Sequence, residues 1–204
     1  MSHYFIDDPK LIADERRFAH YLSSTRLDFV SDAGLFSHGH VDGATDLLLR
    51  MMIADEHFLP IAGEHGKFLD LGCGWGAVGV AAVKLFPALR VTFADVNPKA
   101  LHFAAKNAKA NNISGKFILS DAFENLSDMF DIIVLNPPIH AGKDICCTML
   151  TGSAKHLTPG GALYVVMHKK HGALSMIEKL TALFDVKILC RKKGVLVFRC
   201  MHKL

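Results

Sequence analysis

Apolar and polar positions follow two different spacings along this chain of 204 residues, and the two spacings alternate from residue 67 onward. Short apolar runs rich in β-branched residues predict buried strands, and longer segments with apolar residues every three or four positions predict helices. Strands are expected at residues 68–71, 90–95, 116–121, 130–136, 162–168, 186–190 and 195–200. Helices are expected at residues 77–86, 98–111, 143–156 and 173–184.

The alternation of strands and helices predicts repeated βαβ units, and therefore an α/β fold with a doubly wound, mostly parallel sheet. The strands just named would make this sheet seven-stranded. The turn at Lys193-Gly194 is too short for a crossover connection, so the last two strands are expected to form an antiparallel hairpin.

We interpret residues 1–204 as a single domain, with a core at 61–204 preceded by an extension at 1–60. Within the extension, residues 27–30 and 35–36 suggest a small hairpin, and the segment 42–53 suggests a helix.

Composition excludes several classes of protein. Half of the residues are hydrophobic, yet no apolar run approaches the ~20 residues that a membrane span requires. Residues 1–9 lack the basic and apolar regions of a signal peptide. The five cysteines are scattered without a CxxC pair, which favours a reducing cytoplasm and no zinc site.

One segment could be interpreted as a metal site. His38 and His40 flank a glycine, and Asp42 follows them. No further cluster of ligands supports this interpretation, so we expect no metal, and Asp42 is better interpreted as the cap of the following helix.

The segment Asn136-Pro137-Pro138 directly follows the apolar run 130–135. Proline ends a strand because it cannot donate a hydrogen bond to the sheet, and asparagine is a poor strand residue. An amide at the carboxyl edge of an open α/β sheet lies where such folds bind ligands. Its oxygen, together with a backbone carbonyl, can bind both hydrogens of an –NH2 group and hold the nitrogen lone pair towards an electrophile. We therefore predict that Asn136, Pro137 and Pro138 are catalytic residues for methylation of a planar amine.

A glycine loop, with glycines at positions 72, 74 and 76, follows the first strand of the core. Glycines allow a backbone to approach a ligand closely at a helix N-terminus. Gly72, Gly74 and Ala77 also fit a dinucleotide pattern, and a tight turn without any ligand is a further alternative. Asp70 favours S-adenosylmethionine, because a carboxylate repels a pyrophosphate and attracts an ammonium or a sulfonium group.

Two more carboxylates end neighbouring strands. Asp95 could accept both ribose hydroxyls of a cofactor or cap the following helix, and Asp121 could accept an adenine amine or remain exposed. The predicted cofactor-binding residues are therefore Asp42, Asp70, Gly72, Gly74, Gly76, Asp95 and Asp121.

The glycine loop, the two strand-end aspartates and Asn136-Pro137-Pro138 together resemble a class I S-adenosylmethionine-dependent methyltransferase of the amino-methylating branch. The segments 34–37, 41–43, 136–143 and 169–173 extend this resemblance to small MTS methyltransferases similar to bacterial 16S ribosomal RNA guanine-N2 methyltransferases. It covers residues 3–204 and implies a Rossmann-like fold, S-adenosylmethionine as cofactor and RNA as partner. The larger enzymes carry a further domain ahead of the catalytic one that this sequence does not contain, which leaves the substrate open.

The resemblance also assigns roles to residues. It implies that the Asn136 oxygen and the Pro137 carbonyl accept the two N–H groups of the amine, and that Asp42 lies near the methionine end of the cofactor. Many relatives carry an aromatic residue that stacks on the base where this chain has Ile139. Ile139 is therefore a candidate for a weaker contact with the base, and Phe36 is a second candidate that could help. His140 is a candidate for substrate contact without a defined role.

Basic residues cluster at the expected carboxyl edge of the sheet. The segments 168–171 and 191–193 are expected at the same carboxyl edge as Asn136. The net charge of the chain is only +3, so a local cluster of this kind favours contact with an RNA backbone over mere solvation. The predicted phosphate-binding residues are Lys143, Lys169, Lys170, Arg191, Lys192 and Lys193.

We conclude from the sequence that the chain methylates an exocyclic amine, with guanine N2 of ribosomal RNA as the first candidate. A protein glutamine-amide methyltransferase would use the same acceptors, but its family usually has tyrosine after the second proline and the basic edge argues against it. A third hypothesis is a non-catalytic RNA-binding protein that retains S-adenosylmethionine. The presence of both Asp95 and Asn136 argues against it, because a non-catalytic protein would be expected to have lost one of them. The nucleotide, the choice between free RNA and an assembled subunit, and the oligomeric state are not specified by the sequence.

Overall fold

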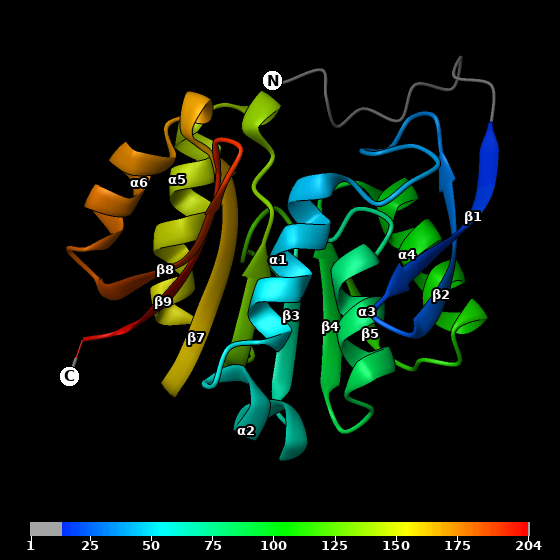
Figure 1. Cartoon of the computed structure of the whole chain (residues 1–204), viewed down its shortest axis with the longest axis horizontal. Coiled ribbons are helices and arrows are strands. Elements are labelled where there is room, and N and C mark those ends of the chain that lie inside the picture. The colour runs from blue at the N-terminus through cyan, green and yellow to red at the C-terminus, as the bar shows by residue number, and fades with distance from the viewer. Residues whose placement is uncertain (1–13, 204) are drawn as a thin grey trace.

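A twisted sheet of seven strands forms the centre of the molecule, as predicted (Figure 1). The computed structural model describes residues 14–203. The strands follow the order β5-β4-β3-β6-β7-β9-β8, and pairing is parallel except at β9, which is antiparallel to both of its neighbours. The strands are β3 (Lys67–Leu71), β4 (Arg90–Asp95), β5 (Lys116–Leu119), β6 (Phe130–Leu135), β7 (Leu157–His168), β8 (Phe184–Lys192) and β9 (Val195–His202).

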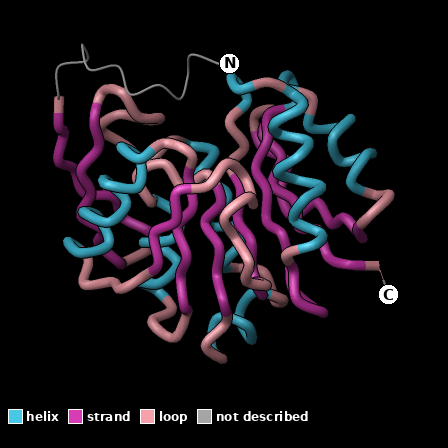
Figure 2. The backbone as a smooth tube through the Cα atoms, turned by 180° about the vertical axis from the view of Figure 1, so that it is seen from behind, coloured by secondary structure: helices cyan, strands magenta, loops and turns pink. Residues whose placement is uncertain are grey.

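Helices cover both faces of this sheet (Figures 1 and 2). On one face α1 (Gly43–Ile53), α3 (Ala77–Leu85) and α4 (Pro98–Ala110) bury a continuous apolar core, and on the other α5 (Lys143–Gly152) and α6 (Ala173–Leu180) bury a second one. Apolar side chains that alternate along β3 and β6 point into the two cores in turn, which explains why these strands have no polar face. The remaining elements are α2 (Phe58–Gly63), which the sequence analysis missed, and the short 3-10 turns η2 (Ile139–Ala141), η3 (Ser153–Lys155) and η4 (Lys169–His171).

The N-terminal hairpin differs from its prediction. It pairs β1 (Glu15–Leu22) with β2 (Thr25–Asp32), whereas residues 35–36 lie in the loop that follows β2. The prediction of residues 35–36 as a strand was therefore wrong, and the true partner was overlooked. β1 begins with charged, exposed residues and turns only every second side chain inward from Phe18 onward, so its apolar pattern is weak.

Two asparagines complete the hydrogen bonding of β2, namely Asn107 on α4 and Asn111 at the C-cap of that helix. The Asn107 side chain accepts from the backbone N–H of Val30 at 2.7 Å and donates to the carbonyl of Val30 at 2.9 Å. Asn111 repeats both contacts with Asp28, at 3.1 and 2.8 Å. Four residues of a helix rise about 6.0 Å and two residues of a strand about 6.7 Å, so side chains one turn apart match alternate positions of β2.

Several boundaries moved relative to the predictions. β7 begins at Leu157 rather than at residue 162, and it contains the Pro159-Gly160-Gly161 segment because its register with β6 shifts between Phe130 and Ile132. The helix expected to reach residue 184 ends at Leu180, since Phe184 already belongs to β8 and is buried.

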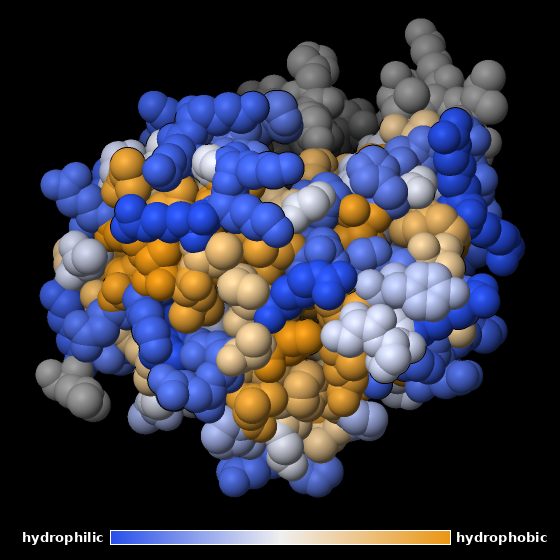
Figure 3. All heavy atoms as spheres, in the orientation of Figure 1, coloured by the Kyte–Doolittle hydropathy of each residue, from blue (hydrophilic) through white to orange (hydrophobic). Residues whose placement is uncertain are grey.

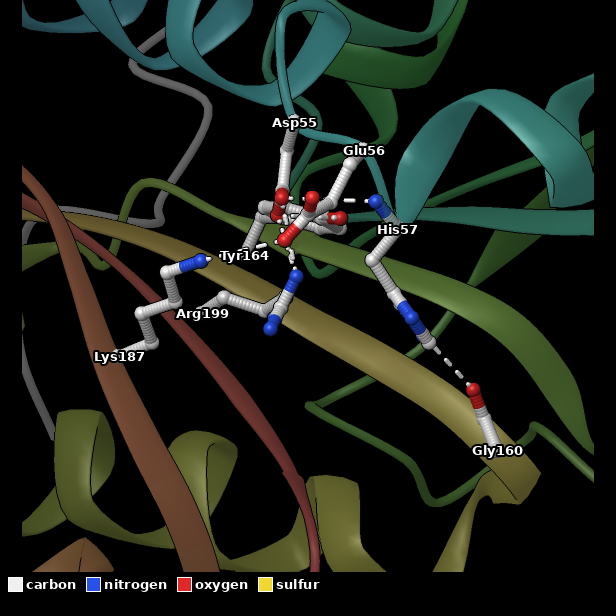
Figure 4. A network of polar contacts seen from close by, with 7 residues as sticks. All are labelled: Asp55, Glu56, His57, Gly160, Tyr164, Lys187 and Arg199. Atoms are coloured by element: carbon white, nitrogen blue, oxygen red, sulfur yellow. Dashed lines mark hydrogen bonds and ion pairs between the residues drawn. The ribbon is translucent and has the colours of Figure 1, made fainter.

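A buried ionic network joins the segment after α1 to the sheet (Figure 4). Arg199 Nη1 donates to both carboxylate oxygens of Asp55, at 2.9 and 2.8 Å, and the Tyr164 hydroxyl donates to the same carboxylate at 3.0 Å. The Asp55 side chain is 3% exposed and the Arg199 side chain 13% exposed. Burial, followed by the charge of Asp55, raises the pKa of Tyr164. The neighbouring ion pair between Lys187 and Glu56 is exposed.

No helix within residues 14–203 has the length and apolar character needed to cross a bilayer. The interpretation of residues 1–9 concerns a segment outside the described residues.

Candidate functional site

Neighbouring strands end at the same level on the carboxyl edge of the sheet. Leu71 at the end of β3 pairs with Ala94 of β4 on one side and with Leu135 of β6 on the other. Asp95 and Asn136 therefore flank the start of the glycine loop, from the strands on either side. The fold brings together predicted cofactor and catalytic residues that belong to different βαβ units and are far apart in sequence.

The glycine loop needs its glycines for different reasons. Gly72, Gly74 and Gly76 have φ angles of 65°, 54° and 84°, in the left-handed region that disfavours residues with a side chain. A Cβ atom on Gly76 would lie 3.1 Å from the backbone of Ala104, so this glycine also permits close packing of the loop on α4. A Cβ atom on Gly74 would meet no atom within 4 Å, so the backbone at Gly74 borders open space.

Asp95 holds the glycine loop in place. Its carboxylate accepts from the backbone N–H of Gly74 at 2.8 Å and from that of Asn97 at 2.9 Å. Burial raises the pKa of Asp95, although these backbone donors oppose the shift. The side chain therefore positions the loop and the turn that precedes α4, and it stays only partly buried. The alternative role of Asp95 as the helix cap was wrong, because Asn97 caps α4 and accepts from the Lys99 N–H at 2.9 Å.

Asp70 lies deeper than expected for a residue at the mouth of a site. It is 4% exposed, and its Oδ2 accepts from the Gly79 N–H in the first turn of α3 at 2.8 Å. Burial raises the pKa of Asp70 to about 7, and the neighbouring charge of Asp95 contributes in the same direction. Its main contact is thus with the helix N-terminus, and direct contact with a ligand stays a prediction.

Asp121 and Asp42 occupy contrasting environments. Asp121 is exposed just beyond β5, whose end is tied to β4 by the Ser120 N–H to Asp95 carbonyl hydrogen bond of 3.0 Å. Asp42 caps α1 as predicted, since its side chain accepts from the backbone N–H groups of Ala44 and Thr45.

Asn136 is the polar residue that emerges from β6. Its Nδ2 donates to the Thr45 hydroxyl at 3.0 Å, and its Oδ1 receives no hydrogen bond from the described residues. The Pro137 carbonyl is likewise without a donor in residues 14–203, whereas the Pro138 carbonyl accepts from Ala141 N–H at 2.8 Å. The Asn136 amide oxygen is thus free of protein donors at the sheet edge, and the carbonyl of the adjacent, buried Pro137 receives none either. Thr45 was missed by the sequence analysis, because nothing local relates positions 91 residues apart.

Trp75 ties the glycine loop to the loop after β2. Its Nε1 donates to the Phe36 carbonyl at 2.8 Å, and its own carbonyl accepts from Asn107 at 2.8 Å. The indole packs edge-on between Phe18 and Phe29, with ring centroids 5.6 and 5.0 Å away. This contact places residue 36 beside the glycine loop, although Trp75 was not among the predicted site residues.

The two candidates for contact with a base differ in exposure. The Phe36 side chain is 53% exposed, as a stacking surface requires. Ile139 in η2 is partly buried and packs against the core below α5, so it offers less free surface. Its greater exposure therefore favours Phe36 over Ile139 as the residue predicted to stack on a base.

Two basic turns meet at the same edge, as predicted. The Lys169 N–H at the start of η4 donates to the carbonyl of Gly194 in the β8–β9 turn at 2.8 Å. Figure 3 shows strongly hydrophilic side chains crowded at the upper left, over this end of the sheet. The cations concerned are exposed, and no ion pair joins any of them to an acidic side chain among the described residues: Lys143, Lys169, Lys170, Arg191, Lys192 and Lys193.

Histidines border this basic region. The rings of His168 and His171 lie edge to face at 5.5 Å, and burial together with the nearby charges of Lys170, His168 and His140 lowers the pKa of His171. His38 and His40, in the other histidine pair, bind backbone carbonyls. Within residues 14–203 no group of three or more potential ligands could hold a metal ion.

A hollow of about 960 Å³ lies at the opposite, amino edge of the sheet. Its cations are already engaged: Lys67 and Lys116 pair with Asp128, and Lys84 donates to a backbone carbonyl. It is remote from Asn136 and forms no part of the candidate site.

Residues 26–199 match the family model described as the methyltransferase small domain, MTS. The chain belongs to the MTS family. The resemblance inferred from its motifs is therefore confirmed, together with the Rossmann-like methyltransferase fold.

Several relatives of this MTS protein are known. It is 34% identical over 202 residues to the uncharacterized protein YbxB of Bacillus subtilis, with 97% of each chain covered. It is 38% identical over 137 residues to ribosomal RNA small subunit methyltransferase C of Pasteurella multocida, covering 65% of this chain and 39% of that protein. The chain thus spans less than half the length of that ribosomal RNA methyltransferase.

A solved methyltransferase structure is also similar to this chain. The T. thermophilus 16S rRNA N2 G1207 methyltransferase RsmC, in complex with AdoMet and guanosine, superposes with a TM-score of 0.82 and 25% identity. The match covers 96% of this MTS chain and 52% of that one.

Proposed function

We propose that the chain is an S-adenosylmethionine-dependent N-methyltransferase that acts on an exocyclic amine of RNA, namely guanine N2 of ribosomal RNA. The observation that carries this proposal is the Asn136 amide, whose nitrogen is bound to Thr45 while its oxygen is available at the sheet edge beside the glycine loop. The relatives that methylate ribosomal RNA support the choice of substrate, as does a solved relative bound to AdoMet and guanosine.

The residues at the edge of β3 and β4 suit S-adenosylmethionine. The open space beside Gly74 allows a ligand to approach the backbone, and Asp95 reaches the same loop with a carboxylate that retains free lone pairs. The raised pKa values of Asp70 and Asp95 mean that positive charge nearby would be favourable, since a cation would stabilise both ionised carboxylates. Asp95 would bind the ribose hydroxyls, Asp121 the adenine amine, and Asp42 and the glycine loop would border the methionine end.

The chemistry follows from charge. A guanine exocyclic nitrogen is a poor nucleophile because its lone pair is delocalised into the ring. Acceptance of its two N–H groups by Asn136 Oδ1 and the Pro137 carbonyl favours a pyramidal nitrogen and stabilises the positive charge that develops on it. S-adenosylmethionine, when bound, supplies a methyl group already attached to a good leaving group. The chain therefore acts mainly by positioning, and the methylated nitrogen, which is cationic and acidic, loses its extra proton to water without a strong general base.

The decisive test is a map of methylated nucleotides in ribosomal RNA from cells with and without the protein. We expect one guanine to lose N2 methylation in the deletion strain and to regain it with the wild-type gene but not with Asn136→Ala. An unchanged map would contradict the proposal, and a missing methyl group on a protein glutamine would favour the glutamine-amide alternative.

Asp95→Ala is expected to weaken S-adenosylmethionine binding by about 1–3 kcal/mol, because polar groups of the ligand lose their acceptor. Asp95→Asn, which keeps one acceptor oxygen, should lose less. Titration calorimetry measures both, and Asp128→Ala at the opposite edge of the sheet serves as the control. Unchanged affinity in Asp95→Ala would remove this residue from the cofactor site.

Neutralisation of the two basic turns is expected to weaken RNA binding and to flatten its dependence on salt. For each phosphate that the protein no longer neutralises, the slope of log K against log salt should fall by about 0.7–0.9. The variant replaces Lys169, Lys170, Arg191, Lys192 and Lys193 by glutamine, and the control replaces the amino-edge cations Lys67, Lys84, Arg90 and Lys116. Equal slopes per charge removed in the two variants would mean that the turns are merely solvated, and would favour a protein substrate.

A further inference from the structure

The amide of Asn136 is held from a distant element. Its Nδ2 donates to the Oγ1 of Thr45, which belongs to the first turn of α1, at 3.0 Å. Thr45 is 5% exposed, so water does not compete freely for this hydrogen bond. A buried hydroxyl that binds a side chain at the carboxyl edge of the sheet can influence what that side chain presents.

The position of the Thr45 hydroxyl is itself fixed. Asp42 accepts from the backbone N–H of Thr45 at 3.2 Å and from that of Ala44 at 2.9 Å, which anchors the first turn of α1. Leu48 and Leu49, on the following turn, are buried against the sheet. Because threonine is β-branched, its χ1 angle is restricted in a helix. The hydroxyl therefore offers its oxygen from a rigid support.

An asparagine amide has a donor end and an acceptor end, and rotation by 180° exchanges them. Binding of Nδ2 by Thr45 leaves Oδ1 as the end that is free of donors from the described residues. In the rotated state, Nδ2 would face the N–H groups of an incoming amine, so two donors would oppose each other. Because a threonine hydroxyl can also donate to Oδ1, the hydrogen bond to Thr45 restrains the side chain in place, and the N–H groups of the amine favour the state that presents Oδ1.

We propose that Thr45 is a positioning residue that holds the Asn136 side chain at the sheet edge, where its Oδ1 can accept from an amine. This inference rests on the proposed function, because the amine is the substrate group assigned there.

The first test compares Thr45→Val, which keeps the shape and removes the hydroxyl, with Thr45→Ser, which keeps the hydroxyl. Loss of one hydrogen bond that favours the reactive orientation should lower the single-turnover rate of Thr45→Val about tenfold. The affinity for cofactor should hardly change, and Thr45→Ser should keep most of the rate. An equal loss in both variants would overturn the proposal, since packing rather than the hydroxyl would then be responsible.

A double-mutant cycle separates positioning from a general loss of stability. In an Asn136→Ala background, Thr45→Val should lower the rate no further, because no amide remains to be oriented. Thr151→Val is the matched control, since it removes another helical hydroxyl, which binds the Cys147 carbonyl at 2.8 Å. An undiminished effect of Thr45→Val in the Asn136→Ala background would contradict the inference.

A further readout does not depend on methyl transfer. By NMR, the side-chain –NH2 protons of Asn136 should exchange with solvent several-fold faster in Thr45→Val than in the wild type, and in Thr45→Ser they should not. Unchanged exchange in Thr45→Val would overturn the role of Thr45 even in an active enzyme. If the wild type transferred no methyl group to RNA, the proposed function would fail while this measurement would still decide whether Thr45 orients Asn136.

Discussion

Asn136→Ala is expected to lower the single-turnover rate of methyl transfer by about 10²–10³-fold while leaving cofactor affinity within about twofold. The acceptor at Asn136 matters most when positive charge develops on the substrate nitrogen, so its removal raises the barrier more than it weakens ground-state binding. The adjacent Pro137 carbonyl remains in this variant, which should preserve a residual rate. Rapid-quench measurement of a labelled methyl group on the identified RNA provides the rate.

A matched control is available at the same edge of the sheet. Asn125 follows β5 and uses its amide to bind the backbone carbonyl of Leu119 at 2.8 Å. Asn125→Ala should leave the rate of methyl transfer close to that of the wild type. If Asn136→Ala and Asn125→Ala reacted at equal rates, Asn136 would have no part in the mechanism.

The largest effect on stability is expected from Asp55→Ala, which should lower the free energy of unfolding by about 3–5 kcal/mol. The substitution leaves the guanidinium of Arg199 and the hydroxyl of Tyr164 buried without their common acceptor. Because the pair is buried, added salt should screen its contribution only weakly. Urea unfolding at low and high ionic strength measures both quantities.

Glu56→Ala is the control for this loss. It removes the neighbouring carboxylate, whose ion pair with Lys187 joins side chains that are 84% and 55% exposed. Exposed pairs contribute about 0–1 kcal/mol, so the midpoint of unfolding should hardly move. Similar losses in Asp55→Ala and Glu56→Ala would show that burial of the Arg199 pair does not stabilise the fold.

The sheet could be predicted from the sequence because its strands are continuous apolar runs separated by helices, a pattern that few other folds produce. Asn136 was also accessible, since an amide followed by two prolines has little reason to end a buried strand. The antiparallel pairing of β9 with β8 could be predicted from the short turn at Lys193-Gly194. Local chemistry was thus sufficient wherever neighbours in sequence decide the conformation.

Features that depend on tertiary contacts could not be predicted from local sequence. β1 exposes most of its side chains, and its inward positions from Phe18 onward include the polar His20, so its apolar alternation is weak. The contact of Thr45 with Asn136 joins separate elements and leaves no local trace. Asn107 of α4 did leave a signal, because asparagine is unfavourable inside a helix unless its side chain has a partner, whereas Asn111 lies at the C-cap and leaves none.

Those asparagines also bear on how the molecule behaves in a crowded solution. A two-stranded hairpin has open edges, and an open edge can recruit a strand from another molecule. Asn107 and Asn111 occupy the outward N–H and C=O groups of Val30 and Asp28, as a neighbouring strand would. Helix α4 therefore closes that edge of β2 with side chains alone, and the hairpin is protected on this side from the growth of intermolecular sheets.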